Sequence, residues 1–256
     1  MYKHNKKYGW VPDLPDIRDF KYAAPRRNLF TPRLPKKVDL SGLCPAVYDQ
    51  GVLGSCTANA IAAAIQFDLM KQKAEIFMPS RLFIYYNERV LEGTASYDSG
   101  ATLRSGLKTV VKEGTCPEPE WEYVIHKFSV KPPKPCYASA QKHQVLEYRR
   151  VAQKLSEIKG CLAEGYPFVF GFMCYDSFES PEVSRSGDLS LPQAGETPRG
   201  GHAVMCVGYD DDLGVVKILN SWGASWGAEG YFTMPYSYIE NTDLARDFWT
   251  IRLVEQ

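Results

Sequence analysis

A glycine-rich turn ends in a cysteine at the start of a predicted helix. The segment runs from Gln50 to Cys56, with glycines at positions 51 and 54. A helix N-terminus lowers a thiol pKa and directs backbone N–H groups at an oxyanion formed on an attacked carbonyl. A cysteine taken at random is more often a small buried core residue. The turn and the helix start favour chemistry instead, with Cys56 as nucleophile and an oxyanion hole formed by Gln50 and the Cys56 N–H.

A histidine and an asparagine are brought together by a predicted hairpin. His202 opens one β-rich segment, Asn220 ends the next, and residues 211–214 between them are turn-like. The midpoint between positions 202 and 220 is 211, so the two side chains should be neighbours on paired strands. Asparagine can accept the imidazole N–H and orient the ring toward a thiol. A lone histidine is usually an ordinary polar residue, but this pairing makes His202 the candidate base and Asn220 its orienting partner.

The elements that position these residues change type along the chain. Apolar residues at three- and four-residue spacing, with capping residues, predict helices near residues 55–69, 80–91, 101–113 and 151–164. Ser55 is the expected cap of the first helix. Segments rich in Val, Phe, Tyr and Ile predict strands at residues 168–175, 202–209, 215–220 and 231–234. Helices followed by strands indicate an α+β protein in two lobes with a cleft between them.

The domain organisation follows from composition along the chain. Residues 1–33 carry four prolines and clustered charges, and we expect an extended arm. The body then covers residues 34–256, with a helical lobe at about 50–145 and a β lobe at about 146–256. Within it, residues 131–135 are proline-rich and should be extended, and residues 179–201 should form a long loop at the rim of the cleft.

The overall composition excludes several classes of protein. Lys plus Arg and Asp plus Glu both number 30, so no charge excess favours nucleic acid or an anionic membrane. No stretch reaches the roughly 18 apolar residues of a membrane span, and the polar N-terminus is no secretory signal. We therefore expect a cytoplasmic protein, although specialised export needs no such signal. The seven cysteines contain no CxxC pair, so zinc is not expected, and the cysteine and histidine chemistry outlined above requires no metal or organic cofactor.

Taken in order, these motifs resemble the papain family of cysteine peptidases, from about Leu34 to the C-terminus. Cys56 and His202 are 202 − 56 = 146 residues apart, within the roughly 130 to 150 of that family, and Asn220 is slightly further on. The matching blocks are 34–39, 49–51 with 54–56, 201–204, and 220–231. The resemblance implies a helical left lobe, an antiparallel β-barrel-like right lobe, and peptide bound in the cleft between them. It also implies substrate-binding roles for Ser99, Gly100, Gly201 and Trp222, and Trp222 should in addition shield the His–Asn contact from water.

The departures from the family pattern concern packing more than chemistry. Most relatives have a cysteine three residues before the nucleophile and a tryptophan just after it, where this chain has Leu53 and Thr57. We expect no long helical propeptide. Instead, residues 8–20 resemble the short leader of the bacterial xylellain-like members. We expect this arm to lie in the cleft and block it, against the alternative of a loosely attached tail.

The expected function is hydrolysis of peptide bonds through a Cys56 thioester, by an endopeptidase made as an autoinhibited zymogen. Its partners should be a peptide or protein substrate and its own arm, and it should be a monomer. Two alternatives use the same cleft. In an acyl transferase an amine, not water, would resolve the thioester, and a non-catalytic binding protein would keep the cleft without turnover.

Overall fold

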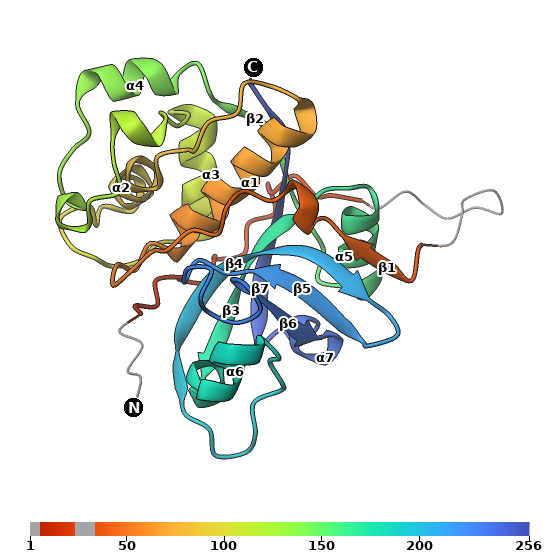
Figure 1. Cartoon of the computed structure of the whole chain (residues 1–256). Helices are drawn as coiled ribbons and strands as arrows, with labels where there is room; N and C mark the ends of the chain where they lie inside the picture. The colour runs from red at the N-terminus through yellow and green to blue at the C-terminus, as the bar shows by residue number, and fades with distance from the viewer. Residues whose placement is uncertain (1–5, 24–33, 256) are drawn as a thin grey trace.

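The computed structural model describes residues 6–23 and 34–255, and these form two lobes, one helical and one built on a β-sheet (Figure 1). The helical lobe contains α1 (Cys56–Gln72), α2 (Arg81–Glu92), α3 (Leu103–Lys112) and α4 (Lys134–Ala140). The other lobe contains β1 (Lys37–Asp39), β2 (Val145–Arg150), α5 (Leu155–Ala163), β3 (Phe168–Tyr175), α6 (Pro181–Ser186), β4 (Pro198–Asp210), β5 (Val215–Leu219), β6 (Tyr231–Pro235), α7 (Tyr236–Ile239) and β7 (Ala245–Val254). The predicted α+β class is confirmed.

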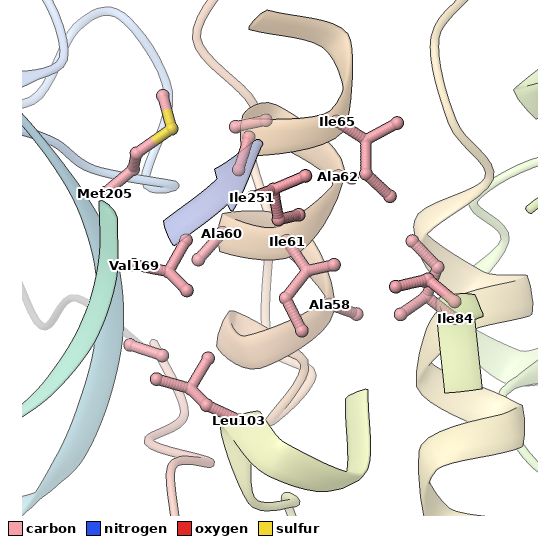
Figure 2. Packing of buried hydrophobic residues seen from close by; sticks show 14 of the residues in the cluster. Ala58, Ala60, Ile61, Ala62, Ile65, Ile84, Leu103, Val169, Met205 and Ile251 are labelled. Carbon is pink, nitrogen blue, oxygen red and sulfur yellow. The ribbon is translucent and has the colours of Figure 1, made fainter. Parts of the chain in front are cut away.

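Helix α1 joins the lobes because it is apolar around nearly its whole circumference. Such a helix must be buried on all sides. Figure 2 shows Ala60 on the side of Val169 in the sheet and Ile65 on the side of Ile84 in α2, and these four residues are at most 4% exposed. Small alanines let the helix lie close to the sheet. The N-terminus of α1, where Cys56 stands, is therefore held by both lobes.

The sheet alternates its side chains between two cores. On β3, Val169 packs into the core shared with α1, whereas Phe168 and Phe170 pack into a second core on the opposite face with α5. On β4, Met205 faces α1 and Val204 faces away. This period of two is what a sheet covered on both faces requires.

The predicted hairpin that carries His202 is present, with a small shift of register. β4 and β5 pair antiparallel with Met205 opposite Leu219, and the turn lies at residues 211–214. A bulge between Cys206 and Gly208 displaces the pairing from the symmetric midpoint. The strand order is β2-β7-β3-β4-β5-β6, with β1 paired to β4. Among the described residues the sheet stays open, so the expected barrel-like lobe is an unclosed sheet.

Three sequence expectations about elements were wrong. The stretch 131–135 is not wholly extended, because α4 begins at Lys134 and Pro135 fits the first turn of a helix, where no N–H is needed. The stretch 179–201 is not one loop, because it contains α6 and the beginning of β4. Ser55 precedes α1 but makes no side-chain cap, and its hydroxyl contacts Tyr123 instead. Strands β2 and β7 had no predicted counterpart.

Candidate active site

A tight turn delivers Cys56 to the first position of α1. Gly51 has a φ of +61°, a region that glycine occupies without strain. Two groups hold this turn from outside. The Gln50 N–H donates to the Ser221 carbonyl at 2.9 Å, and the Gly54 N–H donates to the Asp98 carboxylate at 3.2 Å. The helix start and its cysteine are thus fixed by residues from both lobes.

The Cys56 thiol is fully buried. Burial raises the pKa of Cys56 to about 12, although the backbone N–H groups of Ala203 and Gly9 near the sulfur oppose that rise. Gly9 belongs to the N-terminal arm, so the arm itself contributes to this burial. With the arm in place, Cys56 is a neutral thiol at physiological pH.

His202 and Asn220 lie in contact at the edge of the hairpin. His202 Nε2 and Asn220 Oδ1 are 2.8 Å apart. The Ser221 N–H also donates to Asn220 Oδ1, at 2.8 Å, which marks this atom as the oxygen and makes His202 Nε2 the donor. His202 Nδ1 is left as an acceptor and has no hydrogen-bond partner among the residues described. Burial lowers the pKa of His202 to about 4, so the ring is neutral.

Aromatic rings enclose the His–Asn pair. The Trp222 ring lies 5.1 Å from the His202 ring, centroid to centroid, and Phe178 lies 4.9 Å from Trp222. Trp222 is 3% exposed. Exclusion of water strengthens the electrostatic component of the His202–Asn220 hydrogen bond.

Both polar atoms of the Gln50 side-chain amide have hydrogen-bond partners. Its Oε1 accepts the Ser221 hydroxyl at 2.8 Å, which fixes the amide orientation. Its Nε2 donates to the Leu53 carbonyl at 2.9 Å and to the Lys7 carbonyl at 3.1 Å. A carbonyl oxygen of the arm therefore sits where the amide N–H of an oxyanion hole would point.

The arm backbone is hydrogen-bonded to both lobes on either side of Cys56. The Trp10 N–H donates to the Gly201 carbonyl at 3.0 Å, and the Gly9 carbonyl accepts the Ala101 N–H at 2.8 Å. Trp10 and Ala101 form a parallel bridge. A Cβ built on Gly100 would lie 2.0 Å from the Gly9 carbonyl oxygen, so only glycine permits this approach.

The substrate-binding residues expected from the family resemblance are not all in contact with the arm. Gly201 binds it through its carbonyl, and Gly100 lies directly against it. The Ser99 hydroxyl points elsewhere, donating to Thr94 and to the Gly100 carbonyl. The backbone partner of the arm in this stretch is Ala101.

Side chains of the arm reach into the site on both sides. Tyr8 donates to Glu179 at 2.5 Å and lies edge-on to the His202 ring at 6.2 Å. Trp10 is 5% exposed and lies against β3, where a Cβ on Gly171 would fall 1.9 Å from the indole. Because residue 171 is a glycine and has no side chain, there is room for the Trp10 ring.

A charged cluster anchors the arm beyond Trp10. Arg104 donates to Asp19 at 2.8 Å, and Arg150 donates to the same carboxylate at 3.1 Å. The Asp13 N–H donates to Asp247 at 2.7 Å, and Asp13 accepts from the Trp249 indole at 3.0 Å. Burial, and then the neighbouring Asp247 carboxylate, raise the pKa of Asp13 above its usual value. Arg104 lies in the helical lobe and Arg150 in the sheet, so this cluster also ties the lobes together.

The two departures from the family pattern have structural explanations. Thr57, in place of the usual tryptophan, donates its hydroxyl to the fully buried Glu88 at 2.6 Å. Burial raises the pKa of Glu88 well above its usual value. Leu53, in place of the usual cysteine, is buried and supplies a carbonyl to Gln50. All seven cysteines are free thiols.

Several residues of the site could not be found from sequence. Ser221 holds Gln50, and Tyr123 donates to the Gln50 carbonyl at 2.9 Å from a loop 73 residues away. Glu179 accepts a hydrogen bond from the Tyr8 hydroxyl, although the two residues are 171 positions apart in the sequence. Ser221 lies in the matching block 220–231, but neither its contact with Gln50 nor the contacts of Tyr123 and Glu179 could be read from a motif, because they arise only from the fold.

The sequence profile described as papain family cysteine protease matches residues 34–249. The chain belongs to the papain family and is a cysteine peptidase by that membership. It is similar to an uncharacterized peptidase C1-like protein of Acanthamoeba polyphaga mimivirus, with 41% identity over 98% of this chain and 88% of the relative.

Solved structures agree with this assignment. Xylellain, a cysteine protease from Xylella fastidiosa, is 48% identical, covers 98% of both chains and has a TM-score of 0.91. A procathepsin B from Trypanosoma congolense shares the fold, with 16% identity, a TM-score of 0.75, and coverage of 98% of this chain and 88% of the other. The recognition of the family and of its xylellain-like members is confirmed. The transferase and binding-protein alternatives gain no support from these matches. No helix in the described part of the chain is long and apolar enough to cross a membrane.

Proposed function

We propose that this peptidase cleaves peptide bonds with Cys56 as nucleophile, His202 as acid and base, and Asn220 as the residue that orients His202. The Cys56 thiolate attacks the carbonyl, and the oxyanion receives hydrogen bonds from the Cys56 N–H and the Gln50 amide. His202 protonates the leaving amine. Water then hydrolyses the thioester with His202 as base, and no metal takes part in these steps.

We further propose that the arm is an inhibitory segment. The observation that carries this proposal is the Lys7 carbonyl on Gln50 Nε2 together with the Gly9 N–H beside the Cys56 sulfur. Both groups occupy positions that a substrate carbonyl needs. The buried Trp10 and the charged cluster around Asp13 and Asp19 hold both groups in these positions. Residues 1–5 and 24–33 of the predicted arm lie outside the described residues.

The charges on the enzyme body suit this arm. Lys6 pairs with Asp49 at 2.5 Å and Lys7 pairs with Asp98 at 2.6 Å, on either side of the turn that holds Cys56. Such exposed pairs contribute little stability each. Apolar burial of the arm comes from Trp10, which is 5% exposed, and from Tyr22, which is 6% exposed. A monomeric state and a cytoplasmic location stay predictions of the sequence.

The test compares labelling of Cys56 by an epoxide thiol reagent, followed by intact mass, in four proteins. These are the full chain, a chain starting at Leu34, and His202→Ala in each background. We expect a single rapid adduct on Cys56 in the truncated protein, a much slower one in the full chain, and slow labelling in both histidine variants. Equal rates with and without the arm would overturn inhibition, and rates indifferent to His202 would overturn the assigned pair.

A further inference from the structure

The structure brings together two thiols and a carboxylate in the helical lobe, away from the site described above. Cys116, Glu120 and Cys136 place one sulfur or carboxylate oxygen each within 4.8 Å of one another. Cys116 is fully buried and Cys136 is 2% exposed, while Glu120 lies at the surface. The cysteines are 20 residues apart in the sequence, outside any zinc-type spacing, so only the fold reveals the group.

The three donors suit one kind of ligand. Two sulfur donors select thiophilic ions over magnesium or calcium, and a carboxylate oxygen is also a ligand that zinc accepts. Glu120 and Cys136 line a surface hollow with Pro133 and Ser139, which gives an ion a path inward and leaves space for a water. Glu120 already accepts the Ser139 hydroxyl at 2.9 Å, an outer contact that orients a ligating carboxylate.

We propose that Cys116, Glu120 and Cys136 bind a divalent cation of the zinc class, with water as the fourth ligand. Binding breaks two S–H bonds, forms two metal–sulfur bonds and releases two protons to the solvent, and no electrons are transferred. Thiolates and not thiols bind such ions, so the ion must displace both protons and affinity falls as the pH falls. A disulfide between the same cysteines would leave Glu120 without a role and would need an oxidant.

The ion would brace a loop that supports the Gln50 turn. Residues 117–135 connect the two cysteine ligands, and this loop carries Tyr123, whose hydroxyl contacts Ser55 and donates to the Gln50 carbonyl at 2.9 Å. Trp121 and Phe128 of the same loop pack against the core shared with α1. Tying the ends of the loop together restricts its motion. Ion binding does not depend on the proposed peptidase activity, so the two proposals can fail separately.

The test is a cadmium titration of the full chain carrying Cys56→Ala, after removal of metals by a chelator. We expect one equivalent to bind with the ultraviolet charge-transfer absorbance of thiolate–cadmium bonds, and zinc to displace it. Cys116→Ser and Cys136→Ser should each abolish stoichiometric binding. Cys44→Ser, which removes a partly exposed thiol elsewhere, is the matched control and should change nothing. Zinc should also slow amide hydrogen exchange across residues 117–135.

Glu120→Gln keeps the test decisive even where a buried cysteine variant fails to fold. Because this side chain is exposed, the variant should fold normally. Loss of an outer-shell partner alone lowers metal affinity by at least about tenfold, so loss of a direct carboxylate ligand should lower it by at least that much. Unchanged affinity in Glu120→Gln, or a thiolate band that survives in both cysteine variants, would overturn the proposal. So would a Cys116–Cys136 disulfide that re-forms in the metal-free protein and blocks the titration, since the pair would then be a redox centre.

Discussion

With the arm in place, the Cys56 and His202 side chains are in protonation states that do not suit the catalysis proposed for them. A thiolate–imidazolium pair needs the thiol pKa to lie below the imidazole pKa. Burial places them in the opposite order, at about 12 for Cys56 and about 4 for His202. The ion pair is therefore a minor species at every pH in the covered form.

Removal of residues 1–33 should reverse this order of pKa values. Solvent reaching the site stabilises both charged forms, so the Cys56 pKa falls and the His202 pKa rises. We expect the labelling rate of the truncated protein to be bell-shaped in pH, with a plateau that includes neutral pH. The measurement is the second-order rate constant for thiol labelling between about pH 4 and 9. A rate that only rises with pH, as for an isolated thiol, would contradict the paired state.

The Gln50 amide should contribute to the rate and little to substrate affinity. In the truncated enzyme, Gln50→Ala removes one oxyanion donor, and such losses lower kcat by roughly 100- to 1,000-fold. KM should change little, because the donor acts on charge formed in the transition state. Steady-state kinetics on a peptide substrate measure both constants.

Ser221→Ala provides the comparison for Gln50. It leaves the amide in place and removes only the hydroxyl that holds Gln50 Oε1 at 2.8 Å. We expect a smaller loss of kcat than in Gln50→Ala. A loss confined to KM in either variant would mean that the amide binds ground-state substrate and does not support an oxyanion.

At the scale of elements, the arm is held by two buried aromatic side chains, Trp10 and Tyr22, and by the charged cluster around Asp13 and Asp19. Trp10→Ala should release it, because truncation of a buried tryptophan costs about 3 kcal/mol or more, which corresponds to roughly a 100-fold change in the docking equilibrium. The readout is the rate of Cys56 labelling in the full chain, which should rise toward that of the truncated protein. Leu14→Ala, at a residue 82% exposed, is the matched control and should leave the rate unchanged. Equal rates in both variants would place the anchor elsewhere.

The local elements were largely predictable from sequence, and their partners were not. The hairpin that carries His202 follows from β-rich segments on either side of a four-residue turn, and α1 follows from its apolar spacing. Helix α4 was hidden by its prolines, and β7 by the charged Arg246 and Asp247 at its start. Periodicity gives the type of an element, whereas these two depend on burial supplied by distant segments.

The candidate site divides in the same way. Gln50, Cys56, His202 and Asn220 stand in short motifs, so their types and order could be recognised in the sequence. The contacts that hold the site and the arm join residues far apart in the sequence. Examples are the hydrogen bond from Ser221 to Gln50 and the ion pair of Arg104 with Asp19. Charges of either sign are common along the chain, and nothing in a sequence shows which of them will pair. These contacts become visible only once the lobes are packed.

At the scale of the whole molecule, the arm connects the two lobes as a bound ligand would. It is hydrogen-bonded to Ala101 and Arg104 in the helical lobe and to Gly201 and Arg150 in the sheet lobe. The lobes also share the core around α1, so the body should fold without the arm. A segment that binds only the folded body stabilises it by mass action.

A synthetic peptide of residues 6–23 should therefore stabilise and inhibit the chain that starts at Leu34. At 100 times its Kd the expected stabilisation is about 2.7 kcal/mol, or roughly 5–10 °C in Tm for a domain of this size. Thermal unfolding and peptide hydrolysis should yield the same Kd, because one docking event governs both. A control peptide with Trp10→Ala and Asp13→Asn should lose most of both effects. Inhibition without a rise in Tm would mean that the peptide acts as a competing substrate, and a rise in Tm without inhibition would mean that it docks on the charged cluster and leaves Cys56 open.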